Sequence, residues 1–210
     1  WILTGQAASF AVGYERMLKK NQSMSFGLGH LQMPTLITTE EGDPVEWISN
    51  LRNTGFLVTF DYRFYFSRNK YAKPDGLYWA PYFTFHYIDN KARIAILDND
   101  QIYVDEDLQV YANLAMAGVQ LGYQFVLGNR WTVDLMLLGP GVGYYDFSLQ
   151  LDGDAQINGD ENYIQGIYDV LVTVFPGVET LIDGQRLDDS GRIRFGGGAF
   201  RYGFQVGYRF

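Results

Sequence analysis

The strongest constraint on the fold is a strict two-residue alternation that ends the chain. In residues 199–210 every even position is apolar, and the odd positions from 201 onward are Arg, Gly, Gln, Gly and Arg. Six further segments alternate in the same way, at about residues 9–15, 24–29, 56–66, 77–86, 118–125 and 131–137. A period of two is that of a β-strand with different surroundings on its two faces. The sequence therefore predicts an all-β protein.

Composition excludes several classes of protein. The chain has no Cys, so it has neither disulfides nor cysteine-based metal or redox sites. The net charge of −8 offers no basic stripe for phosphates, so we expect no nucleic-acid partner. No apolar run is long enough for a transmembrane helix.

The connections between these segments alternate in length. Those at 19–22, 67–75 and 128–130 are short, whereas those at about 32–53, 88–113 and 146–192 are long and hold 20 of the 24 acidic residues. Short turns at one end and long loops at the other are typical of an up-and-down antiparallel transmembrane β-barrel. We therefore expect one such domain over residues 1–210. In the loop at 88–113, continued alternation predicts a hairpin that extends two strands beyond the membrane.

The size of the apolar side chains indicates which face points outward. The apolar faces carry about thirty large side chains, too many for the narrow interior of an eight-stranded barrel. A continuous apolar outer band is suited to lipid and would aggregate in water. A soluble barrel or sandwich is the alternative. The aromatic residues that we expect to face lipid include Phe60, Phe64, Trp79, Trp131, Phe204 and Tyr208.

The strand count predicts one further strand. Bacterial barrels have an even number of strands, and seven segments are visible. We expect the first of eight strands before residue 6, largely upstream of residue 1, with residues 1–4 as its upper end. The chain has no initiating Met, so either processing has removed a signal peptide or upstream residues are missing.

Several motifs resemble a Bacteroidota family of small outer-membrane β-barrels, most of unknown function. They are Tyr14-Glu15-Arg16, residues 62–66 running into 74–78, residues 139–144, and Phe200-Arg201-Tyr202-Gly203 with the terminal Phe210. The resemblance covers the strands and not the long loops. It implies an eight-stranded, OmpA- or OmpX-like barrel in the bacterial outer membrane, and it supplies no catalytic residues. The terminal Phe210 also resembles the signal that the outer-membrane assembly machinery reads.

This resemblance, together with the loop lengths, implies an orientation and a set of partners. The carboxyl terminus and the short turns would be periplasmic, and the long acidic loops extracellular. Partners would be outer-membrane lipid, lipopolysaccharide and other outer-membrane or surface proteins.

Six charged residues occupy positions of the alternation that we expect to face the interior of the barrel. A charge in a narrow interior is costly unless it is paired. The sequence therefore predicts an ion-pair network that plugs the barrel, with a proton or ion path as the alternative. The six residues are Glu15, Asp61, Arg63, Asp134, Arg201 and Arg209.

The two histidines are the candidates for general-base chemistry. His86 has interior parity and His30 has lipid-facing parity, both near the loop end of their strands. Some small outer-membrane barrels modify lipid A with a histidine at that level, and Ser148 or a loop acid would complete such a site. No nucleophile motif such as G-x-S-x-G is present, so interfacial histidines are the alternative.

The acidic loops offer oxygen ligands without a recognisable metal motif. Asp98-Asn99-Asp100 with residues 105–107, and residues 152–154 with Asp160-Glu161, do not fit EF-hand spacing. We expect solvated charge here and no cofactor; loop-bound Ca²⁺, or divalent ions bridging to lipopolysaccharide phosphates, are the alternatives.

The last long loop carries a helical pattern at about residues 160–183. Apolar residues recur at intervals of three and four, with a break at Pro176-Gly177. Such a stripe needs cover, either from the barrel mouth or from a partner. The residues that would contact a partner are Ile164, Ile167, Tyr168, Leu171 and Phe175.

These observations favour a non-enzymatic barrel that serves as a structural or accessory subunit of a larger outer-membrane complex. A lipid A-modifying enzyme and a small-solute or ion channel are the alternatives.

Overall fold

Seven β-strands form the part of the chain that the computed structural model describes, which is residues 8–32, 45–66, 75–98, 101–128, 130–152 and 192–209. The described residues are all-β and contain no helix, so none of their elements is a helix able to cross a membrane. The strands are β1 (Ala8–Lys19), β2 (Gln22–Gln32), β3 (Val45–Tyr65), β4 (Gly76–Asp98), β5 (Gln101–Leu127), β6 (Trp131–Asp152) and β7 (Arg192–Tyr208).

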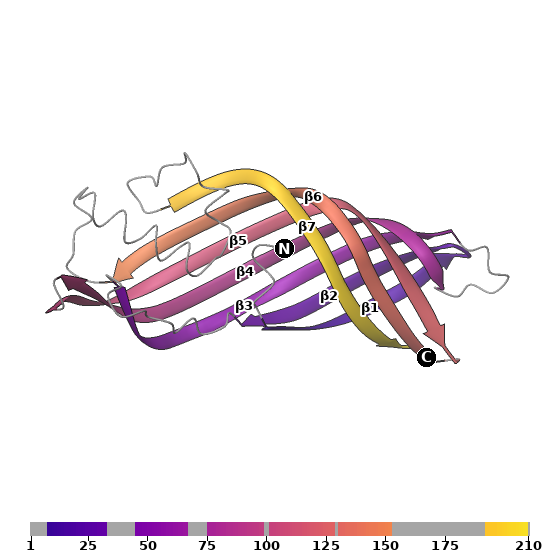
Figure 1. Ribbon diagram of the computed structural model, residues 1–210. Helices are drawn as coiled ribbons and strands as arrows, with labels where there is room; N and C mark the ends of the chain where they lie inside the picture. The colour runs from indigo at the N-terminus through magenta and orange to yellow at the C-terminus, as the bar shows by residue number, and fades with distance from the viewer. Residues whose placement is uncertain are drawn as a thin grey trace.

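The strands form a single up-and-down sheet in chain order. Each strand pairs antiparallel with the next, from β1 to β7, as the alternating segments predict. β1 and β7 are the two edges of the sheet and do not pair with each other in the described residues. Figure 1 shows the strands tilted and the sheet curled, with the tip of the β4–β5 hairpin and the carboxyl terminus at opposite ends.

Alternation gives the sheet two chemically different faces. The convex face carries aromatic and aliphatic side chains such as Phe60 and Phe83, which are 39% and 44% exposed. The concave face, called the interior below, carries buried polar side chains such as Asp61, Arg63 and Gln120. Side chains from distant strands meet across the interior, as between Glu15 on β1 and Gln124 on β5, so the sheet curls around them.

Five strands extend past the alternating segments of the sequence. β3 begins at Val45, inside the loop expected at 32–53, and pairs there with the far part of β4. β6 runs to Asp152, past the expected start of the loop at 146–192, and β7 begins at Arg192, where that loop is expected to end. β4 and β5 continue as a paired hairpin to Asp98 and Gln101, within the stretch at 88–113.

Register shifts explain why the two-residue alternation marks only the second half of β3. Its pairing with β4 shifts between Trp47 and Ser49 and again between Asn50 and Arg52. A bulge inserts one residue and reverses which face the next side chain occupies, so the two-residue period is lost. Pro81 on β4 pairs in register with Val119 of β5, so the pairing of these two strands has no bulge at the proline.

Glycines on β5 and β6 make room for tyrosines in the interior. A Cβ at Gly122 would overlap the ring of Tyr78, which lies opposite it on β4. A Cβ at Gly118 would lie 2.9 Å from Tyr82, and one at Gly141 would lie 2.7 Å from its hydroxyl. Pairing of small with large residues therefore lets a narrow interior hold several aromatic rings.

Some expected features lie outside the described residues. They are the eighth strand before residue 6, the helix at about residues 160–183 with Ile164, Ile167, Tyr168, Leu171 and Phe175, and the terminal Phe210.

Candidate functional site: a polar cluster across the interior

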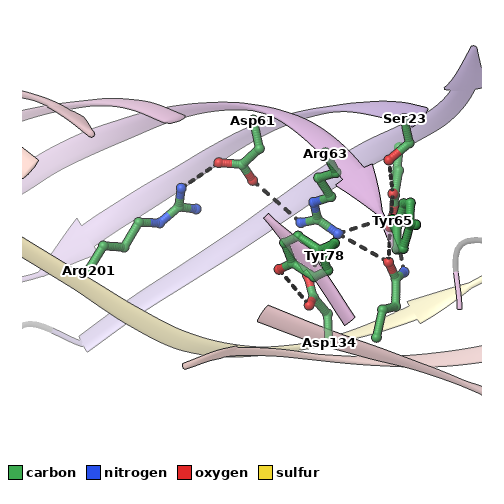
Figure 2. A network of polar contacts seen from close by, with 9 residues as sticks. Ser23, Asp61, Arg63, Tyr65, Tyr78, Asp134 and Arg201 are labelled. Atoms are coloured by element: carbon green, nitrogen blue, oxygen red, sulfur yellow. Dashed lines mark hydrogen bonds and ion pairs between the residues drawn. The ribbon is translucent and has the colours of Figure 1, made fainter. Parts of the chain in front are cut away.

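Arg63 lies at the centre of a polar cluster that crosses the interior. Its guanidinium comes from β3, is 1% exposed, and reaches carboxylates on three strands. Nη1 lies 2.8 Å from Asp134 Oδ2 on β6 and 3.3 Å from Glu15 Oε2 on β1, and Nη2 lies 3.4 Å from Asp61 Oδ2. Figure 2 shows Arg63 between Asp61 on one side and Tyr65 on the other.

Three neutral side chains donate hydrogen bonds to the Glu15 carboxylate. Ser23 of β2 donates a hydrogen bond to Oε1, and the Tyr65 hydroxyl lies 2.8 Å from the same oxygen. The Gln124 amide of β5 donates to Oε2 at 3.1 Å, and its carbonyl accepts from Arg63 and lies within reach of Tyr65. These bonds join β1, β2, β3 and β5 through one carboxylate.

Asp134 and Asp61 extend the cluster in two further directions. The Tyr78 hydroxyl of β4 donates to Asp134 Oδ1 at 2.8 Å, and the Arg63 guanidinium lies over the Tyr78 ring at 4.9 Å. Asp61 accepts a hydrogen bond of 2.5 Å from Arg201 of β7, as Figure 2 shows. The cluster therefore has members on all seven strands.

Charge within this cluster is nearly balanced. Its three carboxylates, on Glu15, Asp61 and Asp134, face two guanidiniums, on Arg63 and Arg201. Removing these groups from water is costly, and close pairing with further hydrogen bonds is what compensates for that cost. The arrangement can hold the curled strands at fixed distances.

The structure brings five of the six predicted interior charges together. Arg209 is the exception, because it follows β7 and its backbone amide donates to the Arg130 carbonyl at 2.6 Å. Four cluster members were not among the predicted site residues, namely Ser23, Tyr65, Tyr78 and Gln124. Two features of the sequence could have identified them. Each occupies an interior-facing position of the alternation, and each side chain ends in a hydroxyl or amide that can hydrogen-bond to a buried charge.

The two histidines lie on opposite faces of the sheet. His86 is buried in the interior, whereas His30 is exposed on the convex face beside Phe56. The sheet therefore separates them, and one catalytic site cannot use both. Ser148 on β6 is half-buried and pairs with Arg192 of β7.

The predicted lipid-facing aromatics all lie on the convex face. Phe64 and Trp79 stack at 4.4 Å between ring centroids, and Trp131 meets Tyr208 edge to face at 5.5 Å. Phe60 and Phe204 are exposed, at 39% and 64%.

Within the described ranges, His, Asp and Glu side chains form no group of three that could hold a metal ion. Asp100, Asp154, Asp160 and Glu161 of the acidic loops lie outside those ranges.

Comparison with known proteins places the chain in a family without assigning an activity. Residues 6–151 match the model of a family described as protein of unknown function (DUF3575). The match begins before β1 and ends within β6, so it includes Glu15, Arg63 and Asp134 and leaves out Arg201 on β7. No curated protein and no solved structure matches the chain. Because the match covers well over half of the 210 residues, the chain belongs to the DUF3575 family of proteins of unknown function.

Proposed function

We propose that this protein is a non-enzymatic integral β-barrel of the bacterial outer membrane and serves as a structural or accessory subunit of a larger outer-membrane complex. The carboxyl terminus and the short turns face the periplasm, and the long acidic loops face outward. One observation supports the proposal above all others. The convex face of the sheet is apolar and exposed, whereas the interior holds a cluster of paired polar side chains.

The convex face has the chemistry and the height that a bilayer requires. On β4 its apolar side chains run from Leu77 to Tyr87, and along β3 they run from Phe56 to Phe66, the residue that follows the strand. Each run is 11 residues long, and a tilted strand needs about 9 to 11 residues to cross the hydrocarbon core. Exposed large apolar side chains recur on all seven strands, so the apolar surface follows the whole curve of the sheet.

The interior cluster favours a scaffold over a channel or an enzyme. Arg63, Asp134 and Tyr78 connect opposite walls at a level where a conducting path would have to pass. His30 and His86 lie on opposite faces of the sheet, so the lipid-modifying alternative would use only one of them.

The part of the sheet that extends past the end of β2 is a surface that another protein could contact. The upper end of β2 pairs at the level of Gly55 and Ile88, so ten residues of β4 continue beyond it, about 33 Å along the strand. β3, β5 and β6 accompany this extension, with Asp107 of β5 opposite Asp152 of β6. An extension of paired strands outside the bilayer is suited to contact with another protein.

Purification in mild detergent tests the proposal. The protein is expected in the outer-membrane fraction, together with stoichiometric partner proteins. In a shortened variant an Asn-Gly turn replaces residues 95–105, so that Ile94 and Glu106 become the closing pair of the hairpin. This variant is expected to reach the membrane and lose its partners. A matched control exchanges Leu97 and Ile102, which pair near the tip, and keeps the hairpin length. A protein that is soluble without detergent, or a membrane-bound monomer that carries no partner, would contradict the proposal.

A further inference from the structure

The described lysines and arginines fall into two groups that differ in their partners. Six of them have a carboxylate within 3.5 Å, either in the interior cluster or on the convex face towards the β4–β5 hairpin. Five others, all at the end of the sheet that carries the short turns, form no ion pair with any described residue. These five, called the basic rim below, are Arg16, Lys19, Lys20, Arg130 and Arg209.

Each member of the basic rim lies at or near the end of a strand. Lys19 and Lys20 are at the turn from β1 to β2, and Arg16 lies three residues before the end of β1, on the convex face. Arg130 directly precedes β6, and Arg209 lies just past the end of β7. Arg209 is half-buried and the other four are exposed. The rim therefore presents its charges to the surroundings of the protein.

Positive charge is in excess at this end, although the net charge of the chain is −8. Asp75 is the only acid in the described part of the short turns, so five cations outnumber one carboxylate. At the opposite end, each described cation of the convex face contacts Asp107 or Asp146. An anionic partner is therefore favoured at the short-turn end.

The rim also borders the exposed apolar side chains of the convex face. Leu18 is exposed between Arg16 and Lys19 in the sequence, and Leu127 is exposed at the end of β5, just before the turn that holds Arg130. Long basic side chains at such a border extend their charge to the level of lipid headgroups while their stems lie along apolar surface. The place of the rim is thus that of a headgroup contact.

Arg130 has the most clearly defined surroundings of the five. Its Nη1 donates a hydrogen bond of 3.2 Å to the Tyr208 hydroxyl, and the exposed Tyr208 ring meets the exposed Trp131 ring edge to face. Tyrosine and tryptophan with one polar end are typical of the membrane–water interface. The backbone amide of Arg209 donates to the Arg130 carbonyl, so a second guanidinium belongs to the same place. Guanidinium groups bind phosphate oxygens through paired N–H donors.

We propose that the basic rim binds the phosphate of anionic glycerophospholipids, such as phosphatidylglycerol, in the leaflet that the short turns face. The acyl chains of the bound lipid lie along the exposed apolar side chains of the convex face. The inference rests on the proposed membrane location and orientation, and it deepens them by naming the class of lipid and the residues that hold it.

Competition between lipids beside Trp131 tests this inference. Trp1, Trp47 and Trp79 are replaced by Phe, so that the fluorescence reports the lipid next to Arg130. Phosphatidylcholine vesicles receive either brominated phosphatidylglycerol or brominated phosphatidylcholine at the same mole fraction. A basic residue near an anionic membrane surface strengthens binding about fivefold, so phosphatidylglycerol is expected to bind beside Trp131 at least about fivefold more tightly than phosphatidylcholine. High salt should reduce this preference. Equal quenching by the two lipids at low salt would overturn the inference.

Two variants of equal net charge assign the preference to the rim. Arg130→Gln/Arg209→Gln is expected to reduce it to about onefold. Lys91→Gln/Arg194→Gln removes the same charge from the opposite end and is expected to keep the preference. An equal effect of the two variants would overturn the inference. If the first variant does not fold, the comparison of the two lipids on the natural rim still decides between the outcomes.

A competition with lipid A distinguishes the two leaflets. Unlabelled lipid A is expected to displace brominated phosphatidylglycerol from Trp131 no better than unlabelled phosphatidylglycerol does. Stronger displacement by lipid A would assign the rim to lipopolysaccharide and overturn the inference.

These outcomes separate the inference from the proposed function. Weak quenching by every brominated lipid would reject the membrane location, and the inference with it. Strong quenching by both brominated lipids without a preference would reject only the phosphate contact of the rim.

Discussion

Arg63 of β3 and Asp134 of β6 form an ion pair of 2.8 Å across the interior, with both side chains almost completely buried. The two residues are far apart in the sequence, and the curl of the sheet brings them together. Their contact is the shortest that Arg63 makes with the three carboxylates around it.

Replacing Arg63 should destabilise the protein far more than replacing an exposed arginine. Arg63→Met leaves Glu15, Asp61 and Asp134 close together without their shared cation, and removing one partner of a buried pair costs about 3–5 kcal/mol. Arg194→Met is the control, since this half-exposed side chain lies 3.5 Å from Asp146 and such pairs contribute about 0–1 kcal/mol. Urea unfolding in detergent micelles measures both free energies. Equal losses for the two variants would show that the cluster does not brace the sheet.

A methyl group added at Gly122 should disturb the interior, whereas one added at Gly198 should not. The Cβ at Gly122 would overlap the Tyr78 ring, and overpacking of this kind costs about 1–3 kcal/mol. A Cβ at Gly198 meets nothing within 4 Å, so Gly198→Ala is expected to change stability by less than about 0.5 kcal/mol. The same unfolding measurement compares the two. A neutral Gly122→Ala would mean that Tyr78 does not occupy this position.

Asp107 on the β4–β5 hairpin should titrate below the range of an ordinary aspartate. Hydrogen bonds from Arg93 and Lys91 lower its pKa in the folded protein. A lowered pKa means that these contacts stabilise the hairpin fully above the unfolded value of about 3.9, and that this contribution is lost as the pH falls through the folded pKa. NMR titration of the carboxyl carbon measures the midpoint. Arg93→Gln is expected to raise the midpoint, and Arg130→Gln at the other end of the sheet to leave it unchanged; no response to Arg93→Gln would contradict the pairing.

Removing both histidines should leave the lipid of the membrane unchanged. His30 and His86 lie on opposite faces, and the proposed function uses neither as a base. Mass spectrometry of lipid A is expected to give the same species from cells with the natural protein, with His30→Ala/His86→Ala, and with none. A species that depends on the protein and disappears in the double variant would establish the enzymatic alternative instead.

Much of the fold could be predicted because its signal is local. Each of the seven alternating segments overlaps one of the seven strands, since each side chain of a strand suits the face on which it lies. Prediction failed where the alternation is interrupted. The bulges near Trp47 and Asn50 concealed the first half of β3, and the glycines from Gly196 to Gly198 concealed the start of β7.

The cluster was only partly predictable, for a different reason. The two-residue alternation predicts that Glu15, Arg63 and Asp134 face the interior. Because a buried charge is costly without an oppositely charged or hydrogen-bonding neighbour, it also predicts that they are paired. Which neutral groups complete the cluster depends on how tightly the sheet curls. The contact of Gln124 with Glu15 spans 109 positions of sequence, and no local pattern specifies such a distance.

The most direct test of the account is whether the convex face contacts acyl chains. Phe83→Trp places an indole at the middle of the exposed apolar run on β4, in a variant whose Trp1, Trp47, Trp79 and Trp131 are replaced by Phe. In vesicles with lipids brominated near the centre of the acyl chain, its fluorescence should be strongly quenched. A matched variant that keeps only Trp47, on the extension of β3 past β2, should be quenched little. Equal and weak quenching of both tryptophans would contradict the assignment of the convex face to lipid.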